Sequence, residues 1–211
     1  MLVAEREAEA GMAKQVHYNA AEHIPAETAA DPYLRPAFAA SDRARRLLWN
    51  VCRMVLYRPS PRPMFAWRAF LLRRFGARMG PNCKFYPGCK VWAPWNLICA
   101  DTVAVADGAA IYNPARVRLG SHAILSQDAY LCGATHDYDD ARFPLLAYEM
   151  EVGAYAWVCA RASVCPGVSV GEGAVLGLGS VATRDLEPWG VYAGVPAVKV
   201  KERKRPAASK E

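Results

Sequence analysis

The sequence has 211 residues, of which 53% are hydrophobic, enough for one main core but not for two full domains. Its net charge of +6 comes from lysines and arginines concentrated in residues 43–78 and 199–210, which predicts an anionic partner such as nucleic acid, an acidic membrane surface or the phosphates of a nucleotide cofactor. The seven cysteines form no CxxC pair and have no histidines at zinc-ligand spacing, so we expect free thiols and no metal site.

The N-terminal part of the chain is predicted to contain an arm and a helical cap. Residues 1–40 have no sustained hydrophobic period and no apolar segment typical of a signal peptide, so we expect a flexible arm and a cytoplasmic protein. Residues 41–80 predict two short helices. The first begins with Ser41 as N-cap and ends before Pro59, and its apolar face consists of Leu47, Leu48, Val51, Cys52 and Val55. The second covers Met64 to Phe75 and ends at Gly76.

A six-residue repeat occupies most of residues 81–198. Its aliphatic positions are Leu119, Leu125 and Leu131, then Val152, Val158, Val164, Val170 and Leu176. The residue four positions after each is small or β-branched in most cases. Neither a helix nor a single strand has this period, whereas short strands and tight turns stacked as a β-solenoid do. The fold class is therefore mainly β, and residues 199–211 are expected to be a basic tail.

Two kinds of irregularity interrupt the repeat. Val91 to Cys99 and Ile111 to Leu119 each take eight residues rather than six, which indicates one special turn used at the same corner of successive coils. Leu131 to Val152 takes 21 residues, so residues 133–151 must leave the solenoid as a loop. Long loops on a rigid scaffold often carry function, and this one contains His136.

The segments PWNL, ILSQDAYLCGATHDYDDARFPL, SVATRDL and AGVPA resemble those of hexapeptide-repeat sugar O-acetyltransferases of the colanic-acid biosynthesis type. The similarity runs from about residue 47 to residue 203. It implies a left-handed β-helix, a homotrimer with active sites between subunits, and acetyl-CoA as the acetyl donor. It also implies a sugar or lipid-linked sugar acceptor, a role in exopolysaccharide biosynthesis and no nucleic-acid partner.

The resemblance makes His136 the expected catalytic base. Acetyl transfer to an alcohol requires a group that takes the hydroxyl proton, and a largely neutral imidazole at pH 7 can do this and later return the proton to the CoA thiolate. Asp137 and Asp139 could fix the imidazole tautomer or hold a sugar hydroxyl, although surface acids are usually only solvated. The expected acceptor-binding residues are Asn113, Asp137, Tyr138 and Trp95. For Asn113, a purely structural Asn-Pro turn is an equally good interpretation.

The same resemblance places acetyl-CoA along the later coils. Small residues there let the backbone approach the cofactor, and basic residues after them could hold its phosphates. The expected acetyl-CoA-binding residues are Ala160, Ser163, Gly177, Gly179, Thr183, Arg184, Lys199 and Lys201. The family commonly has Ala-Lys-Val-Ile-Lys after the AGVPA turn, whereas this chain has AVKVK at 197–201, which leaves the individual phosphate contacts open.

Three other interpretations compete with this one. A γ-type carbonic anhydrase shares the solenoid but needs three zinc-binding histidines, and the coils contain only His122 and His136. The scaffold could instead acetylate another small acceptor, such as serine or a xenobiotic. It could also be a non-catalytic trimer whose helices, with Trp49, Phe65 and Trp67, contact a partner enzyme or the inner face of a membrane. Capping of the solenoid end is the expected use of these helices, and it is compatible with catalysis.

Overall fold

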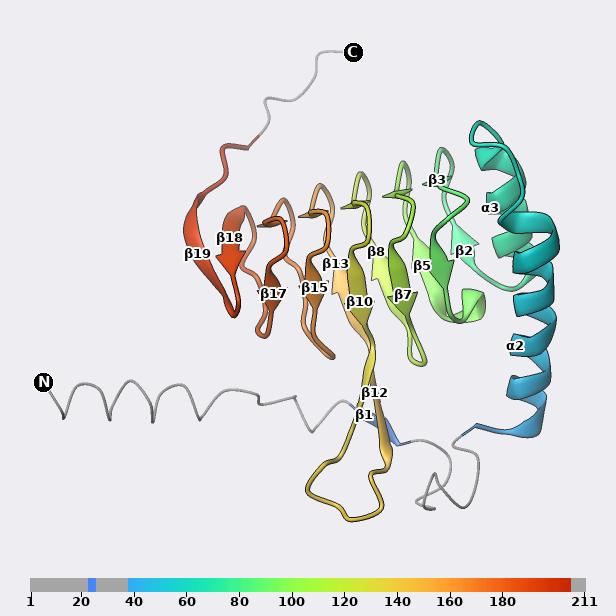
Figure 1. Cartoon of the computed structure of the whole chain (residues 1–211). Helices are drawn as coiled ribbons and strands as arrows, with labels where there is room; N and C mark the ends of the chain where they lie inside the picture. Colours follow the sequence, from blue (N-terminus) through green and yellow to red (C-terminus); the bar gives the residue numbers. More distant parts are fainter. Residues whose placement is uncertain (1–22, 26–37, 206–211) are drawn as a thin grey trace, which may run out of the picture.

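The chain forms a parallel β-solenoid of six coils, with helices at its N-terminal end and a hairpin that protrudes from its side (Figure 1). The computed structural model describes residues 23–25 and 38–205. The predicted mainly β solenoid with short N-terminal helices and a protruding loop is confirmed.

Each coil contributes one short strand to each of three faces. Face 1 contains β2 (Arg78–Met79), β5 (Leu97–Cys99), β8 (Val117–Leu119) and β13 (Met150–Val152), followed by bridges at Val170 and Leu186. Face 2 contains β3 (Lys84–Phe85), β6 (Ala104–Val105), β9 (Ile124–Leu125), β14 (Trp157–Val158), β16 (Val175–Leu176), β18 (Gly190–Gly194) and β19 (Ala197–Glu202). Face 3 contains β4 (Lys90–Val91), β7 (Ala110–Tyr112), β10 (Tyr130–Cys132), β15 (Ser163–Val164) and β17 (Val181–Ala182).

The core is a stack of the repeated aliphatic residues, as the six-residue period predicts. On face 2, Leu125 lies in register with Val105 on one side and Val158 on the other. On face 3, Leu131 lies in the same way between Ile111 and Val164. All eight aliphatic positions of the repeat are buried. Because each such side chain stabilises the fold by about 1.5–3 kcal/mol when buried, the stack accounts for much of the stability.

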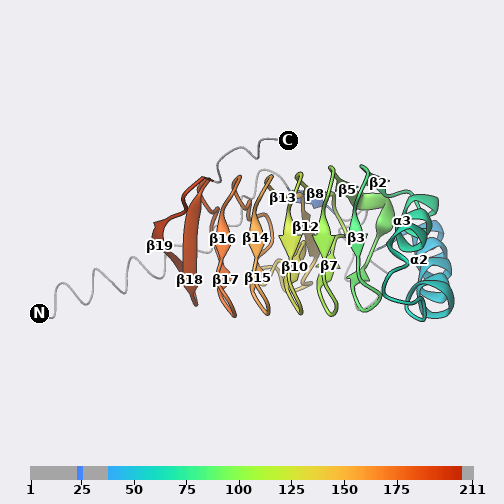
Figure 2. The ribbon, with the colours of Figure 1, turned by 90° about the horizontal axis from the view of Figure 1, so that it is seen from above.

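Helices close the N-terminal end of the solenoid (Figure 2). They are α2 (Ala40–Cys52), the π-helix η1 (Arg53–Tyr57) and α3 (Phe65–Arg74). Trp49 and Tyr57 are buried against the first coil, and the Trp49 indole N–H donates to the Val91 carbonyl over 2.8 Å. The expected helix ends before Pro59 and Gly76 are confirmed.

Two expectations about the first helix are wrong. Its N-cap is Ala39 rather than Ser41, because the helix begins two residues earlier than predicted and Ser41 lies inside its first turn. Its apolar face does not cover the solenoid: Leu47, Leu48 and Val51 are exposed, and Trp49 on the opposite side makes the contact.

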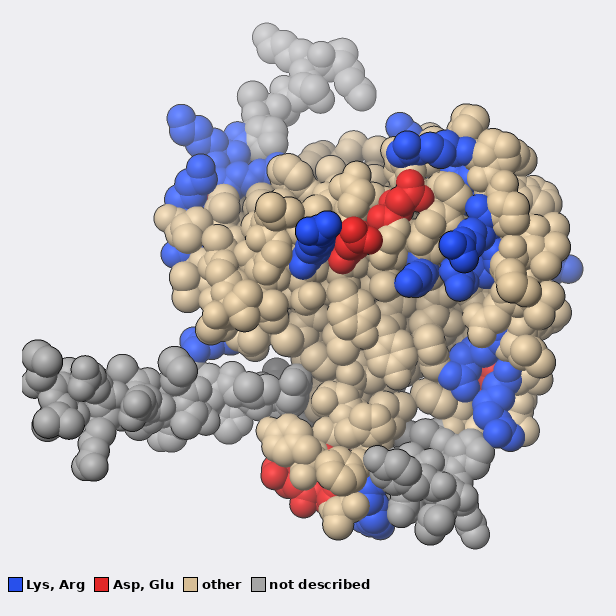
Figure 3. Space-filling model, in the orientation of Figure 1, with Lys and Arg blue, Asp and Glu red and all other residues tan. Residues whose placement is uncertain are grey.

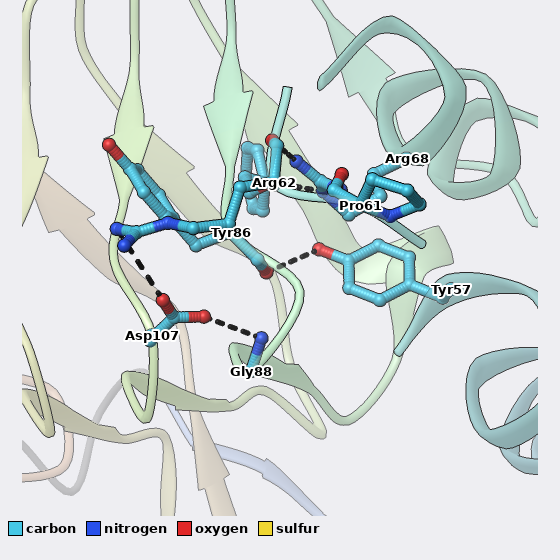
Figure 4. Close-up of polar contacts among 8 residues, drawn as sticks. Tyr57, Pro61, Arg62, Arg68, Tyr86, Gly88 and Asp107 are labelled. Carbon is cyan, nitrogen blue, oxygen red and sulfur yellow. Dashed lines mark hydrogen bonds and ion pairs between the residues drawn. The ribbon is translucent and has the colours of Figure 1, made fainter. Parts of the chain in front are cut away.

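Arg68 of α3 connects the helices to the first coil by hydrogen bonds (Figure 4). This arginine is fully buried, and its guanidinium donates to the carbonyls of Phe85, Pro61 and Arg62 and to the Ser60 hydroxyl. Burial lowers the pKa of the guanidinium. Hydrogen bonds to these four oxygen atoms compensate for the loss of water around the buried charge.

The C-terminal end is closed by a strand where the sequence predicted the start of a basic tail. β19 pairs with β18 in the antiparallel direction, with Lys199 opposite Tyr192 and Lys201 opposite Val191. Residues 199–202 are therefore part of the solenoid domain, and only 203–205 of the expected tail continue as described chain.

The segment between Leu131 and Val152 leaves the solenoid as predicted, but it is a hairpin and not an irregular loop. β11 (Ala134–His136) pairs antiparallel with β12 (Leu145–Tyr148). β12 also pairs with β1 (His23–Pro25), which falls within the expected flexible arm. The rest of the arm, apart from Phe38 to Ala40, lies outside the described residues. No described helix is long and apolar enough to cross a membrane.

Truncating one member of the core stack tests its contribution to stability. Leu131→Ala removes a fully buried side chain, and we expect it to lower the free energy of unfolding by about 2–5 kcal/mol. Leu178→Ala is the matched control because its side chain is 74% exposed, and it should change this value by less than about 0.5 kcal/mol. Urea denaturation at one protein concentration measures both; equal losses would contradict the stacked core.

Candidate active site

His136 lies at the end of β11, where the hairpin begins to turn. Its side chain is exposed. Its Nδ1 atom lies 2.6 Å from the backbone carbonyl oxygen of Phe143, across the hairpin. Strand pairing fixes this geometry, because His136 is in register with Leu145, two residues beyond Phe143.

This contact determines which imidazole nitrogen can act as a base. A carbonyl oxygen has no proton to give, so Nδ1 must be the protonated nitrogen and the donor. In the neutral ring, Nε2 then carries the lone pair. A neutral His136 in this position is therefore ready to accept a proton at Nε2.

Turn contacts within the hairpin hold the Phe143 carbonyl. The Phe143 N–H donates to the Asp140 carbonyl, and Phe143 has a positive φ of 47°. Arg142 pairs with the Asp140 carboxylate over 2.6 Å, and the hydrogen bonds from Arg142 hold the pKa of this carboxyl at about 2. The turn that carries Phe143 is thus closed by both backbone and side-chain contacts.

Asp137 and Asp139 form a turn contact with each other and no hydrogen bond with the His136 ring among the described residues. The Asp137 carboxylate accepts the Asp139 backbone N–H over 3.0 Å, an ordinary turn contact. The His136 ring forms its hydrogen bond with the Phe143 carbonyl and not with a carboxylate. Tyr138 is 62% exposed at the tip, where a second molecule could reach it.

The other two expected acceptor-binding residues, Asn113 and Trp95, have contacts within the chain. Asn113 is fully buried: its amide donates to the Ala93 carbonyl and accepts the Ala93 N–H, which secures the special turn to the preceding coil. These are the contacts that a structural Asn-Pro turn predicts, and acceptor binding by Asn113 stays a prediction. Trp95 is half-buried in the 3-10 helix η2 (Pro94–Asn96), under the Arg45 guanidinium at 4.3 Å. These contacts hold Trp95 against the cap rather than at the hairpin.

Three of the expected acetyl-CoA residues lie at one corner of the later coils. Ala160, Gly177 and Gly179 lie in turns between faces 2 and 3, and the Gly179 N–H donates to the Ala160 carbonyl over 3.0 Å. Gly179 has a φ of +65°, and a side chain there would meet nothing within 4 Å. This corner therefore offers an open backbone surface that a narrow chain could approach.

Ser163 lies on face 3, whereas Thr183 and Arg184 lie beyond β17, between face 3 and Leu186 of face 1. Ser163 pairs with Val181 in the neighbouring coil, and Thr183 directly follows β17. Both are partly exposed, and Arg184 is exposed. The structure thus places four of the eight predicted acetyl-CoA residues on face 3 or at its corner with face 2, and Thr183 and Arg184 at its corner with face 1.

The two lysines of β19 differ in their surroundings. Lys199 pairs with the carboxylates of Glu187 at 2.7 Å and Glu202 at 2.6 Å, and these hydrogen bonds raise the pKa of its ammonium. Lys201 is exposed and has no ion pair with any residue in the described part of the chain. Lys201 is therefore the better placed of the two for a phosphate.

The hairpin with His136 and the turn residues Ala160, Gly177 and Gly179 lie on opposite edges of face 3. The hairpin leaves after β10, at the corner between face 3 and face 1. Ala160, Gly177 and Gly179 lie at the corner between face 2 and face 3. No hydrogen bond or ion pair among the described residues joins the two groups.

A separate groove of about 370 Å³ lies on face 2. It is lined by Trp157, Ile124, Arg203 and the stacked rings of His122 and Tyr155. None of the predicted site residues belongs to it. Within residues 23–25 and 38–205, no group of three or more His, Cys, Asp and Glu side chains could hold a metal ion.

The sequence did not identify the Phe143 carbonyl as part of the site. A backbone oxygen has no residue signature, and only the hairpin pairing shows that it faces His136. The nearest available signal was the spacing of His136 and Phe143 around an Asp-rich turn.

No protein-family model matches the sequence. The chain is 34% identical over 166 residues to the colanic acid biosynthesis acetyltransferase WcaF of Escherichia coli (strain K12), and the match covers 79% of this chain and 91% of that protein. WcaF of Shigella flexneri matches to the same extent.

Two solved structures share the fold at low sequence identity. The acetyltransferase VCA0836 of Vibrio cholerae O1 biovar eltor, solved with acetyl coenzyme A, has a TM-score of 0.71 and 19% identity over 79% of this chain and 91% of its own. A galactoside acetyltransferase in complex with coenzyme A has a TM-score of 0.72 and 20% identity over 79% of this chain and 84% of its own.

The tautomer of His136 can be observed directly. We expect long-range ¹H–¹⁵N spectra at alkaline pH to show a protonated Nδ1 and an unprotonated Nε2, because the Phe143 carbonyl accepts from Nδ1. The His136→Asn variant assigns the signal by its loss. A ring protonated at Nε2 in the neutral form would contradict the hydrogen bond on which the base assignment depends.

Proposed function

The chain belongs to the WcaF family of acetyltransferases, and we propose that it transfers an acetyl group from acetyl-CoA to a sugar hydroxyl, with His136 as the general base. The observation that carries this proposal is the hydrogen bond from His136 Nδ1 to the Phe143 carbonyl. It leaves Nε2 as the basic atom on an exposed side chain, which is what a reaction with an incoming alcohol requires.

In the proposed reaction, the sugar hydroxyl oxygen attacks the thioester carbonyl carbon while Nε2 of His136 takes the hydroxyl proton. The imidazolium that forms keeps its Nδ1–H bonded to the Phe143 carbonyl. When the tetrahedral intermediate collapses, the C–S bond breaks and the proton passes from Nε2 to the CoA sulfur. The products are the acetyl ester and free CoA, and His136 is neutral again.

Supporting the cofactor position is the open backbone corner at Gly179 and Ala160. A pantetheine arm is narrow and needs close approach to backbone amides, which small residues permit. Lys201 and Arg184 are exposed cations that could hold the phosphates by charge-assisted hydrogen bonds. Lys199 would first have to leave Glu187 and Glu202.

The opposite placement of the base and the cofactor corner supports a homotrimer with sites between subunits. In a cyclic assembly each contact is head-to-tail, so two different parts of the subunit surface meet, and we infer that these are the two edges of face 3. The hairpin of one subunit then supplies His136 to the cofactor corner of its neighbour. Tyr138 and Asp137 at the hairpin tip are the candidate acceptor contacts in this cleft.

We infer an exopolysaccharide precursor as the acceptor class, since WcaF is named for colanic acid biosynthesis. Such precursors are built on nucleotide-linked or lipid-linked sugars, which fits a cytoplasmic enzyme. Suitable acceptors for an assay are therefore free sugars, nucleotide sugars and lipid-linked oligosaccharides, with serine as a non-sugar comparison.

Replacing the base tests its role without removing the loop contact. In His136→Asn the amide nitrogen can still donate to the Phe143 carbonyl, but no basic nitrogen remains. We expect the rate of acceptor-dependent thiol release to fall on the order of 10²–10⁴-fold with an unchanged melting temperature. His122→Asn is the matched control on another exposed histidine and should keep wild-type activity. A His136→Asn enzyme within about threefold of wild type would refute the assignment.

Mixing two inactive variants tests the shared site. His136→Asn lacks the base, and Gly179→Trp fills the open cofactor corner of the other edge. Trimers that contain both chains should regain activity, because about one quarter of the sites in a random mixture combine an intact His136 with an intact Gly179. Mixed trimers isolated through two different tags and still inactive would place the whole site within one chain.

A further inference from the structure

The outer surface of the N-terminal cap is a continuous apolar stripe. It consists of Leu47 (66% exposed), Leu48 (63%), Val51 (47%), Met54 (64%), Val55 (58%) and Leu56 (46%). Single exposed apolar residues are common on protein surfaces, but six large ones along two consecutive helices, here α2 and η1, are not. We name these six residues the outer stripe.

The helix places the outer stripe away from the core for a structural reason. Trp49 and Tyr57 bind the helix to the first coil, so the side opposite them faces outward. The wider turn of the π-helix η1 brings Tyr57 to the same inner side as Trp49 and leaves Met54, Val55 and Leu56 all outside. The core is therefore complete without the outer stripe.

The surroundings of the outer stripe are strongly basic. Residues 43–78 contain ten arginines and no aspartate or glutamate. Some of these arginines have internal roles, such as Arg68 in the core and Arg46 in an ion pair with Asp42. Arg43, Arg58 and Arg74 are exposed and have no ion pair or side-chain hydrogen bond within residues 38–205. Figure 3 shows Lys and Arg gathered at this end of the molecule.

The position of the cap leaves the outer stripe accessible to a large surface. α2 is the outermost element at its end of the solenoid, and β18 and β19 lie at the other end (Figure 1). The hairpin with His136 protrudes from the side of the middle coils. A flat partner could therefore cover α2 without blocking the proposed active site.

We propose that the outer stripe and the arginines around it bind the surface of an anionic lipid bilayer. An apolar helical face buries itself at the boundary of headgroups and acyl chains, and flanking arginines contact the lipid phosphates. The charge pattern favours this partner over a second copy of the chain, because two such caps would bring uncompensated arginines together. The attachment is peripheral and independent of acetyl transfer. Together with the proposed function, it would place the enzyme beside lipid-linked acceptors.

Vesicle sedimentation with the full-length protein tests the proposal. We compare vesicles of phosphatidylcholine alone with vesicles that also contain phosphatidylglycerol. The protein should bind the anionic vesicles at least about tenfold more tightly, and this preference should weaken as salt is raised. Leu48→Gln with Val51→Gln, and separately Arg43→Glu with Arg58→Glu, should each reduce binding to anionic vesicles by about tenfold or more.

Matched controls come from the side of the solenoid. Ile124→Gln removes an exposed apolar residue of face 2, and Lys84→Glu with Lys90→Glu reverses two exposed cations, so both should bind like wild type within about twofold. Circular dichroism confirms that each variant is folded. The proposal fails if wild type does not bind anionic vesicles, or if Leu48→Gln with Val51→Gln binds as wild type does. It also fails if that variant changes only the molar mass in light scattering, which would make the outer stripe a contact between copies.

Discussion

The rest of this structure depends on the parallel register that places one aliphatic residue of each face above the same residue of the next coil. Leu125 can stack on Val105 and Val158 only if each coil has the same path through its three corners. An extra residue within a strand would turn the aliphatic side chain outward.

Additional residues are therefore tolerated only at corners, and both irregularities of the repeat occur there. The two-residue addition forms the special turn, where the amide of Asn113 holds the backbone of Ala93. The longer addition leaves as the hairpin with His136 and returns in register at Val152.

A stack of coils also has two open ends, and the chain closes them by different means. At the C-terminal end, β19 reverses direction and pairs with β18, which completes the backbone hydrogen bonds of the last strand. At the N-terminal end, Trp49, Tyr57 and Leu72 cover the first coil with aromatic and aliphatic surface. Arg68 adds hydrogen bonds that connect the loop before α3 with the Phe85 carbonyl. Neither closure uses the outer side of α2, so its side chains are free of any constraint from the core.

Sequence periodicity predicted the solenoid well because a six-residue repeat has one physical solution, and every aliphatic position that it identified is buried. The prediction was wrong for the side of the first helix that contacts the core. The spacing of Leu47, Leu48 and Val51 predicts an apolar face but does not show what covers it, and Trp49 on the other side is the residue that contacts the core.

Predictions for Lys199 and Asn113 were limited in a related way. Their residue types suit ligand binding, but their neighbours in space, Glu187 and Ala93, are distant in sequence and already engage them. The histidine could be found from its loop, whereas the group that orients it is a backbone carbonyl and has no sequence pattern.

That the orienting group is a carbonyl has a consequence for how such a site can diversify. A carboxylate partner would fix a second side chain in the loop and place a negative charge beside the imidazole. The Phe143 carbonyl needs only the hairpin pairing and the turn closed by Asp140 and Arg142, and any residue that tolerates a positive φ could supply it. Side chains at the tip, such as Tyr138, are then free to change without disturbing the position of Nε2. The same hairpin can thus keep its chemistry while its exposed residues select the acceptor, which separates the proposed catalytic function from substrate choice within one short segment.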